Sequence, residues 1–577
     1  MNILGINAYG HDSAVSLLQD GKLIFAVEEE RLNRKKHSGE FPIKSINLAL
    51  NFADTDISNI DHITFPWDPM IALKNAPIYL LKFWKTLPIL LREKKDFSME
   101  EQLGMINHFK DINKIPKRIK ELFSKKNLKF KFHTLEHHMC HAASAFYPSG
   151  FDEAAILTYD GAGEWATTLL GYGYGNKIKK YHTIDTPHSL GAPYQAISRF
   201  LGFSYGEGPG KLMGLASYGK RNSEEYKKLK KLIYYSGDGK FKVNMDYFSY
   251  HYSRRRRGVS DKFIDLFGKP CEDGSSNWNE KQLNLAAGIQ QVTEEIIFDL
   301  AKYLRNKTKS KNLCLAGGVA LNSVTNGLLA KAGVFENIFI QPAAGDSGTS
   351  LGSTLLLNHN ILNNKVNYTQ KDSFLGPEYN ENHIEKELNE AKINYEKKSF
   401  EEIYNLTCEL LLKDKIVGWH QGRMEFGPRA LGNRSFLASP FNAEMKNILN
   451  KRVKFRESFR PFAAIVLEED TGKYFDYSKP NPYMLLVYNV KKDFQKILPA
   501  ITHADETVRI QTVNERENLH MYRLLKKFKE ISGHSVLINT SFNIKGEPIV
   551  CTPKDSIHSF KRADIDSLVI DKFIILK

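Results

Sequence analysis

The chain has 577 residues, of which 42% are hydrophobic, 25% charged and 11% aromatic. This composition excludes a collagen-like, a disordered and a disulfide-scaffold protein, and the length predicts at least two hydrophobic cores. The 81 Lys and Arg against 66 Asp and Glu give a net charge of +15, which favours an anionic ligand such as a nucleotide, an acyl phosphate or a nucleic acid.

The sequence also predicts where the protein resides. Its five cysteines are widely spaced and form no Cys-x-x-Cys pair, which favours a reducing cytoplasm. The first residues lack the basic stretch and apolar core of a secretory signal. The most apolar window, 78–91, contains two lysines and a proline and is shorter than the ~20 residues of a membrane-spanning helix. We expect a buried or groove-forming helix there.

Two parts of the N-terminal half have the same strand-rich character. β-Branched or alternating residues predict strands at 3–8, 13–18, 22–28 and 154–159. Asp20-Gly21 predicts a tight hairpin between the second and third, and a further hairpin is expected around Gly175-Asn176. Because both parts open with similar strands and turns, we expect a duplicated fold.

Further along the chain, a long helix leads to two strands with Gly-rich ends. Apolar residues recur at three- and four-residue spacing from Leu285, which predicts an amphipathic helix. The strands 313–316 and 338–341 each run into a Gly-rich turn, where the backbone can approach a ligand. Between about 358 and 396 apolar periodicity is lost, so the domain boundary is placed there.

The part beyond this boundary is rich in arginine. Buried strands are predicted at 415–419 and 536–539. Between them lie Arg423, Arg429, Arg434, Arg452, Arg456, Arg460 and Arg509. Guanidinium groups bind phosphate bidentately, whereas a solvated surface explains poorly so many arginines beside glycines and apolar residues. We therefore expect a triphosphate site in this half.

A histidine pair indicates a metal site. His137 and His141 lie at i and i+4 of a predicted helix and so share one face. Asp160 and Asp346 are the acidic residues of the two Gly-rich turns and can complete a ligand set that suits Fe(II), Mn or Zn. The alternative for the pair alone is a capped or solvated helix face. The two turns favour the metal.

Other signals are weaker when taken singly. His11 lies in the turn between the first two strands and could face a ligand, although Asp12 and Ser13 could simply cap that turn. Lys36 belongs to a basic cluster that could neutralise a phosphate or form a solvated surface. The string 206–214 lacks the Walker spacing, and the run 254–257 is better explained as a solvated loop than as a nucleic-acid contact.

In this order, the strings resemble the NodU/CmcH family of O-carbamoyltransferases over nearly the whole chain. The most specific are His-Asp-Ser-Ala at 11–14, His-His-x-x-His-Ala at 137–142, Asp-Gly-x-Gly at 160–163, Gly-Gly-Val-Ala-Leu-Asn at 317–322, the string at 422–435 that begins Gly-Arg-Met-Glu-Phe-Gly-Pro-Arg, and Phe-Arg-Pro-Phe-Ala at 459–463.

The resemblance implies an α/β protein with two domains. Residues 1–366 are expected to form a duplicated actin-like (ASKHA) domain similar to TsaD, and residues 375–577 a YrdC-like α/β domain. The C-terminal domain is expected to make carbamoyl adenylate from Mg-ATP and carbamoyl phosphate. The N-terminal domain then passes the carbamoyl group to a hydroxyl of a small molecule, such as a sugar, an antibiotic or another natural product.

Matching motifs imply roles for individual residues. The expected ligands of a divalent metal, with Fe(II) preferred, are His137, His141, Asp160 and Asp346, and His11 is a candidate base. The expected carbamoyl adenylate contacts are Lys36, Gly161, Gly318 and Asn322. The expected ATP and carbamoyl phosphate contacts are Arg429, Lys454, Arg460, Arg509, Asn539 and Ser541. No nucleic acid or membrane partner is expected.

Two other functions remain as alternatives. An actin-like half could belong to a sugar kinase, with Asp160 or Asp12 as the base, although the histidine pair argues against it. A basic chain related to TsaD and YrdC could also bind RNA in tRNA modification. The sequence leaves open the acceptor hydroxyl, the native metal and a homodimer. It also suggests that the part from about residue 375 forms the adenylate on its own.

Overall fold

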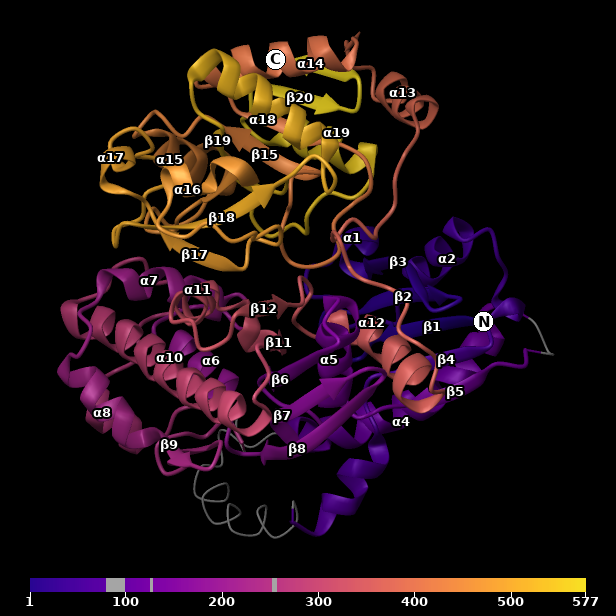
Figure 1. Ribbon diagram of the computed structural model, residues 1–577, viewed down its shortest axis with the longest axis vertical. Coiled ribbons are helices and arrows are strands. Elements are labelled where there is room, and N and C mark those ends of the chain that lie inside the picture. Colours follow the sequence, from indigo (N-terminus) through magenta and orange to yellow (C-terminus); the bar gives the residue numbers. More distant parts are fainter. Residues whose placement is uncertain (79–98, 125–127, 252–256) are drawn as a thin grey trace. The chain divides into compact units, whose positions relative to one another are not determined.

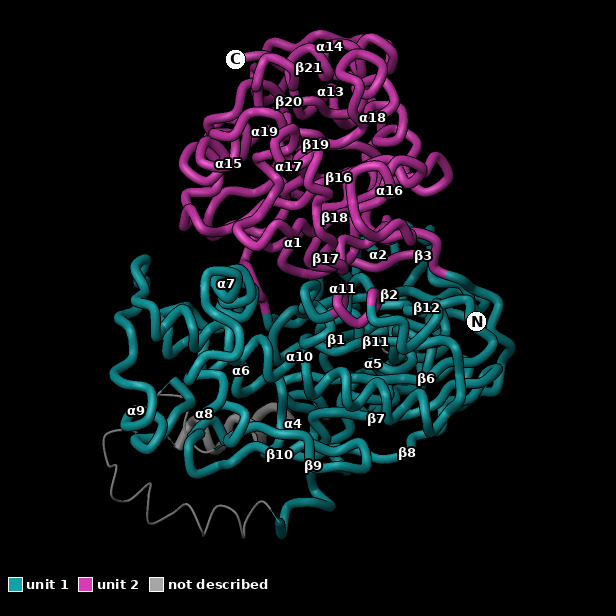
Figure 2. Tube along the Cα trace, turned by 60° about the vertical axis from the view of Figure 1, so that its left-hand side comes forward, with its two compact units in different colours: residues 1–24, 39–325, 332–369 teal, residues 25–38, 326–331, 370–577 magenta. Residues whose placement is uncertain are grey.

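The computed structural model describes residues 1–78, 99–124, 128–251 and 257–577. Nearly all of the apolar window 78–91, and all but the last residue of the run 254–257, lie outside these residues. The chain divides into two compact units, coloured teal and magenta in Figure 2. Unit 1 comprises residues 1–24, 39–325 and 332–369, and unit 2 comprises residues 25–38, 326–331 and 370–577.

Unit 1 is built around two mixed five-stranded sheets (Figure 1). The first has the order β3-β2-β1-β4-β5, formed by Lys22–Glu28, Ala14–Gln19, Asn2–Asn7, His62–Phe65 and Lys131–Thr134. The second has the order β8-β7-β6-β11-β12, formed by Lys177–Asp185, Ala166–Tyr174, Glu153–Tyr159, Asn312–Ala316 and Asn337–Ile340. In each sheet the central strand pairs antiparallel with the strand that follows it and parallel with its other neighbour. The two sheets therefore repeat one topology.

Each sheet ends in a strand that leads into a buried helix. α5 (His137–Phe146) follows β5, α12 (Ser347–Leu355) follows β12, and the two helices pack against each other. The other longer helices of this part of the chain are α2 (Ile43–Phe52), α4 (Met99–Leu122), α6 (Gly191–Phe200), α7 (Gly208–Leu215), α8 (Glu224–Leu232), α9 (Asp261–Phe267), α10 (Glu280–Thr308) and α11 (Ser323–Lys331). β9 (Ile233–Gly237) and β10 (Lys240–Val243) form a separate hairpin.

Local sequence signals explain these elements. Asp20 and Gly21 have φ angles of 49° and 77°, the left-handed conformation that a two-residue hairpin turn requires, so the predicted hairpin is confirmed. The predicted long helix is α10, which begins five residues before Leu285 because Asn279 and Gln282 form a capping box. The Gly-rich string at 206–214 forms most of α7 rather than a phosphate loop.

Unit 2 contains one nine-stranded mixed sheet with helices on both faces (Figure 1). Its order is β13-β21-β20-β14-β15-β19-β16-β18-β17, formed by Glu396–Lys397, Phe573–Leu576, Ser567–Ile570, Val417–His420, Arg434–Ala438, Val536–Ser541, Ala463–Leu467, Thr507–Val513 and Leu486–Asn489. Neighbouring residues such as Phe436 and Leu437 point into different cores, because side chains alternate along a strand. α14 (Phe400–Leu412) and α18 (Leu519–Ser532) contribute to one core, and α13 (Glu381–Glu390) and α19 (Pro553–Arg562) to the other.

The register of this sheet brings several loops together at one set of strand ends, which we call the sheet edge. The pairs nearest this edge are His420 with Arg434, Ser435 with Ser541, Ala463 with Asn539 and Ala464 with Ile510. The loop between β14 and β15, the approach to β16 and the end of β19 therefore converge there. Among the described residues, no helix has both the length and the hydropathy needed to cross a bilayer.

Candidate functional site

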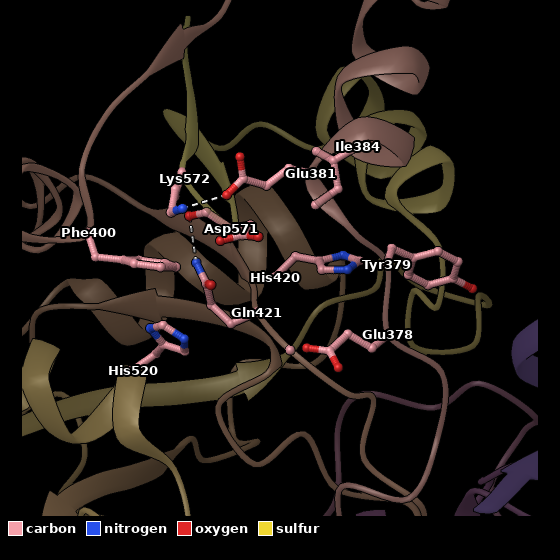
Figure 3. Close-up of a pocket in the computed structure, with 11 residues that line it drawn as sticks. Glu378, Tyr379, Glu381, Ile384, Phe400, His420, Gln421, His520, Asp571 and Lys572 are labelled. Carbon is pink, nitrogen blue, oxygen red and sulfur yellow. Dashed lines mark hydrogen bonds and ion pairs between the residues drawn. The ribbon is translucent and has the colours of Figure 1, made fainter. Parts of the chain in front are cut away.

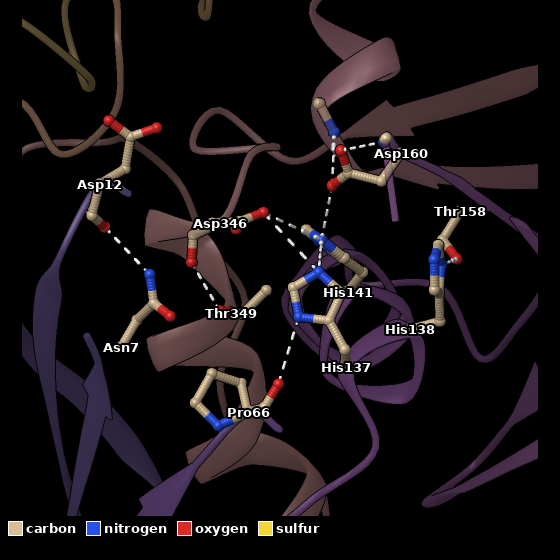
Figure 4. Close-up of polar contacts among 12 residues, drawn as sticks. Asn7, Asp12, Pro66, His137, His138, His141, Thr158, Asp160, Asp346 and Thr349 are labelled. Carbon is tan, nitrogen blue, oxygen red and sulfur yellow. Dashed lines mark hydrogen bonds and ion pairs between the residues drawn. The ribbon is translucent and has the colours of Figure 1, made fainter. Parts of the chain in front are cut away.

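Four predicted metal ligands meet in unit 1, and three of them stand at equivalent positions of its repeated topology. His137 and His141 stand at the start of α5 after β5, and Asp346 precedes α12, which follows β12 in the same way. Asp160 lies in the turn after β6. The side chains of His137, His141, Asp160 and Asp346 each offer one ligand atom, and these atoms all lie within 4.8 Å of one another (Figure 4).

The His137 imidazole is prepared to act as a neutral ligand. The His137 Nδ1 lies 3.2 Å from the Pro66 carbonyl, which can only accept, so Nδ1 carries the proton and Nε2 keeps its lone pair. Burial and the neighbouring His141 hold the pKa of His137 well below its usual range. The Nε2 atoms of the two rings are 3.1 Å apart, and His141 Nε2 is 3.1 Å from the Asp160 carboxylate. This set of two nitrogens and two carboxylates fits a divalent metal such as Fe(II), Mn or Zn.

Asp160 is fixed by the two predicted adenylate-binding glycines. Gly161 N–H donates to Asp160 Oδ1 at 2.6 Å, and Gly318 N–H donates to Oδ2 at 3.1 Å. A Cβ atom on Gly318 would lie 3.0 Å from Asp160 Oδ1, so a larger residue would disturb the carboxylate. Asn322 is 8% exposed and exchanges hydrogen bonds with Gln290 at 2.9 and 3.2 Å. In the structure, Gly161 and Gly318 thus hold the Asp160 carboxylate, whereas Asn322 is engaged with Gln290.

His11 lies beside this cluster, in the turn between β1 and β2. Its Nε2 is 3.6 Å from the Asp346 carboxylate and its Nδ1 is 3.0 Å from the carboxylate of Asp12. The charge of Asp346 is the main cause that raises the pKa of His11 well above its usual range, and Asp12 adds to it. A cation bound to Asp346 would act against that shift.

Glu164 supports the metal ligands through backbone hydrogen bonds, and no sequence pattern had marked it as a site residue. It lies between β6 and β7, is 2% exposed, and accepts the backbone N–H groups of His137 at 3.0 Å and Asp68 at 2.6 Å. It thus joins the first residue of α5 to the loop that carries Pro66. Burial raises the pKa of Glu164 to about 8. A cue in hindsight is its place in the Asp-Gly-x-Gly-Glu string, four residues after Asp160.

We expect Glu164→Ala to lower the free energy of unfolding by about 2–6 kcal/mol, because two buried N–H groups lose their acceptor at about 1–3 kcal/mol each. Metal affinity should fall by about 10–100-fold, as for other residues that orient ligands. Chemical unfolding and metal titration measure the two effects. Glu136→Ala is the matched control, since Glu136 forms a partly exposed pair with Lys180. Equal losses in both variants would contradict the supporting role of Glu164.

The predicted phosphate-binding residues meet at the sheet edge of unit 2. Burial and Arg460 lower the pKa of Arg429 to about 10. The pKa of Arg509 also lies well below its usual range, because of burial and of the charges of Arg429, Arg456 and Arg460. The Nε groups of Arg429 and Arg509 and the Oδ1 of Asn539 are buried without a hydrogen-bond partner among the described residues. A cluster of mutually repelling cations with unused donors suits a polyanion.

Two predicted residues of this cluster, Lys454 and Ser541, form hydrogen bonds within the protein itself. The Lys454 ammonium donates to the carbonyl and hydroxyl of Ser541 and to Asn543. Because an ammonium has only three donors, Lys454 chiefly holds the turn after β19 in place. Lys36 belongs to unit 2, whereas the other predicted adenylate contacts belong to unit 1, and its charge contributes to the lowered pKa of Lys454. Arg456, which the predicted set omits, stacks on Phe462 within the same cluster.

A separate small pocket opens elsewhere in unit 2 (Figure 3). Its cavity of about 140 Å³ is lined by the carboxylates of Glu378, Glu381 and Asp571, by two imidazoles and by Lys572, which pairs with Glu381. Burial lowers the pKa values of both, His420 and His520, so they are neutral acceptors. These groups suit a small cation rather than a phosphate. The pocket is therefore not the predicted triphosphate site.

Comparisons with known proteins agree with these features. A model described as "Carbamoyltransferase N-terminus" matches residues 2–355, and one described as "Carbamoyltransferase C-terminus" matches residues 408–577. An uncharacterized protein of Synechocystis sp. is 40% identical over 612 residues, covering 100% of this chain and 97% of that protein. The nodulation protein NolNO of Sinorhizobium fredii is 33% identical over 99% of this chain and 80% of that protein. The 3'-hydroxymethylcephem-O-carbamoyltransferase of Amycolatopsis lactamdurans is 32% identical over 50% of this chain and 53% of that enzyme.

Proposed function

The chain belongs to the carbamoyltransferase family, and from this premise we propose that it makes carbamoyl adenylate in unit 2 and transfers the carbamoyl group to a hydroxyl in unit 1. The observation that supports this division is the presence of two chemically unlike sites in one chain. Unit 2 gathers arginines suited to a triphosphate, whereas unit 1 gathers two imidazoles and two carboxylates. A single-step transfer would need only one of them.

In the first reaction, carbamoyl phosphate and water give carbamate and phosphate. A carbamate oxygen then attacks the α-phosphorus of ATP, and the bond to pyrophosphate breaks. Arg429, Arg460 and Arg509 would neutralise the charge of the triphosphate and of the leaving pyrophosphate. The unused Nε donors of Arg429 and Arg509 are groups that such a ligand would satisfy, whereas the buried Oδ1 of Asn539 is an acceptor that could take an N–H or O–H group of a substrate.

In the second reaction, the acceptor hydroxyl attacks the carbamoyl carbon and AMP leaves, while the hydroxyl proton passes to a base. His137, His141, Asp160 and Asp346 would hold the divalent metal, which supplies Lewis-acid polarisation. Gly161 and Gly318 keep Asp160 in its place through their N–H groups. His11 is the proposed base, because its ring lies at the edge of the same cluster.

The proposal extends to the fold classes implied by the sequence. The repeated five-stranded topology of unit 1 supports an actin-like, TsaD-like domain, with the candidate ligands at the junction of its halves. The nine-stranded sheet of unit 2 is the proposed YrdC-like domain. The proposed substrates are ATP, carbamoyl phosphate and a hydroxyl-bearing small molecule.

The direct test follows both reactions in the full-length protein. Incubation with ATP and carbamoyl phosphate should release pyrophosphate, and a cognate acceptor should then release AMP and gain the mass of one carbamoyl group. Mass spectrometry of small molecules from cells with and without the protein identifies that acceptor. Release of ADP with a phosphorylated sugar would support the kinase alternative instead. A tRNA shift at physiological salt would support RNA binding.

Replacing His11 with asparagine is expected to slow carbamoyl transfer by about 10²–10⁴-fold, the usual contribution of a positioned general base. Asparagine keeps a hydrogen-bonding group in the turn, so metal content and adenylate formation should persist. A single-turnover measurement with preformed carbamoyl adenylate isolates the step. An unchanged rate would mean that another group, such as Asp12, takes the proton.

A further inference from the structure

Residues 25–38 belong to unit 2 although they lie near the start of the chain (Figure 2). They contain the end of β3 and the short helix α1 (Glu29–Asn33). Ala26 N–H donates to the Leu375 carbonyl at 3.0 Å. Arg34 donates to the carbonyls of Ile549 and Pro548 at 2.7 and 2.8 Å. The segment is thus bound at points distant from it in sequence.

A charged clasp joins this segment to Gly427. The Gly427 N–H donates to Glu28 Oε1 at 2.8 Å, and Arg31 Nη2 donates to the Gly427 carbonyl at 2.9 Å. Arg31 also pairs with Glu30 at 2.7 Å, and none of the three charged residues is more than 8% exposed. A buried ion pair is favourable only when its remaining hydrogen bonds are completed. Here each backbone group of Gly427 bonds one charged partner, while Glu28 Oε2 and Arg31 Nε face each other at 3.5 Å.

The backbone conformation of Gly427 sets the direction of the loop that carries Arg429. Its φ of 121° is disfavoured for residues with a side chain, so the chain turns at this point. Leu32 of the segment packs against a small core cluster that includes Met424 and Ala430, the residue after Arg429. From within the loop, the Glu425 carboxylate accepts three backbone N–H groups at 2.7–3.1 Å. The loop 425–434 is therefore held by Glu425 from inside and by residues 25–38 from outside.

We propose that residues 25–38 take part in adenylate formation as a clasp that keeps the loop 425–434 in the conformation that places Arg429 in the cationic cluster. Arg31 is then a positioning residue, which acts through Arg429. The inference rests on the function proposed for unit 2. It also revises the expectation that the part from residue 375 works alone, because that part lacks the clasp.

The test uses the full-length protein with Arg31→Met, and Lys35→Met as the control, since Lys35 is an exposed lysine of the same segment. Arg31→Met should lower kcat/KM for pyrophosphate release by about 10²-fold, the cost of a catalytic group misplaced by about 1 Å. Arg31→Lys should give an intermediate value. In an Arg429→Ala background, the same Arg31→Met change should have little further effect on kcat/KM. Both changes act on the same interaction, the binding of the anion by Arg429.

The outcomes separate the clasp from the proposed reaction. Additive effects in the double variant, or equal rates for Arg31→Met and Lys35→Met, would overturn the clasp. If Arg31→Met fails to fold, Leu32→Ala takes its place in the same cycle, since it leaves no buried charge unpaired. Calorimetric binding of inorganic pyrophosphate serves as a second readout. A wild-type protein that binds pyrophosphate more tightly than Arg31→Met but releases none from ATP would retain the clasp and refute the reaction.

Discussion

Replacing His137 with alanine is expected to remove the divalent metal and to lower carbamoyl transfer by about 10³-fold or more. Lewis-acid polarisation contributes several kcal/mol, and each 1.36 kcal/mol corresponds to a tenfold change in rate. The variant loses the one ring nitrogen that the Pro66 carbonyl orients toward the other ligands. Pyrophosphate release in unit 2 should be unchanged, because its residues have a separate core. Elemental analysis and single-turnover transfer measure the two losses.

His138→Ala is the matched control for this variant. His138 is equally buried on the same helix, but its Nδ1 bonds the Thr158 hydroxyl at 2.7 Å and its ring lies away from the cluster (Figure 4). The control should lose stability but keep the metal. Asp346→Ala should behave like His137→Ala. Full metal occupancy in both ligand variants would show that the ligand set is wrong.

Arg460→Ala is expected to reduce pyrophosphate release from ATP and carbamoyl phosphate by about 10²–10³-fold, the cost of losing one preorganised donor to developing negative charge. The positive charge of Arg460 acts on the whole cluster, because it lowers the pKa values of Arg429, Lys454, Arg456 and Arg509. Its removal therefore relieves repulsion among the other cations while weakening their hold on the anion. A coupled pyrophosphatase assay follows the reaction.

The control for this change is Arg452→Ala. Arg452 lies close in sequence but pairs with the exposed Asp564 at 2.7 Å, outside the cluster. It should keep nearly full activity. Metal content and transfer from preformed carbamoyl adenylate should be normal in both variants. Equal activity of the Arg460 and Arg452 variants would place adenylate formation elsewhere in the chain.

The signals that succeeded in the sequence are local ones. Asp20 and Gly21 determine a hairpin by their own backbone preferences, and His137 and His141 share a face because four residues make about one helical turn. The predicted strand 22–28 has the same bounds as β3. Asp160 and Asp346 could be added because both follow strands that end in glycine-rich turns. Their approach to the histidines depends on the repeated topology, which only similar openings suggested.

The parts that were missed depend on tertiary contacts. The string Glu28-Glu29-Glu30-Arg31 has the composition of a solvated helix, and nothing local shows that Arg31 meets the backbone of Gly427. Glu164 is an ordinary glutamate until the N–H groups of two other segments converge on it. The role of Lys454 as a phosphate contact is a prediction from the matching motif, and only the structure shows that its ammonium donates to Ser541 and Asn543 in the turn after β19.

The clasp has a consequence for synthesis on the ribosome. Arg31 and Gly427 are 396 residues apart, so at about 5–20 residues per second the glycine emerges roughly 20–80 s after its partner. During that interval the loop that contacts Glu28 and Arg31 has not yet been synthesised, so the side chains of Glu28, Glu30 and Arg31 remain in contact with water. Unit 2 cannot reach its final form from the nascent C-terminal part by itself, and closing so long a loop late makes its folding slow. If the gene were divided anywhere between the codons for residues 38 and 370, its two products would have to associate in order to complete unit 2 and its nine-stranded sheet.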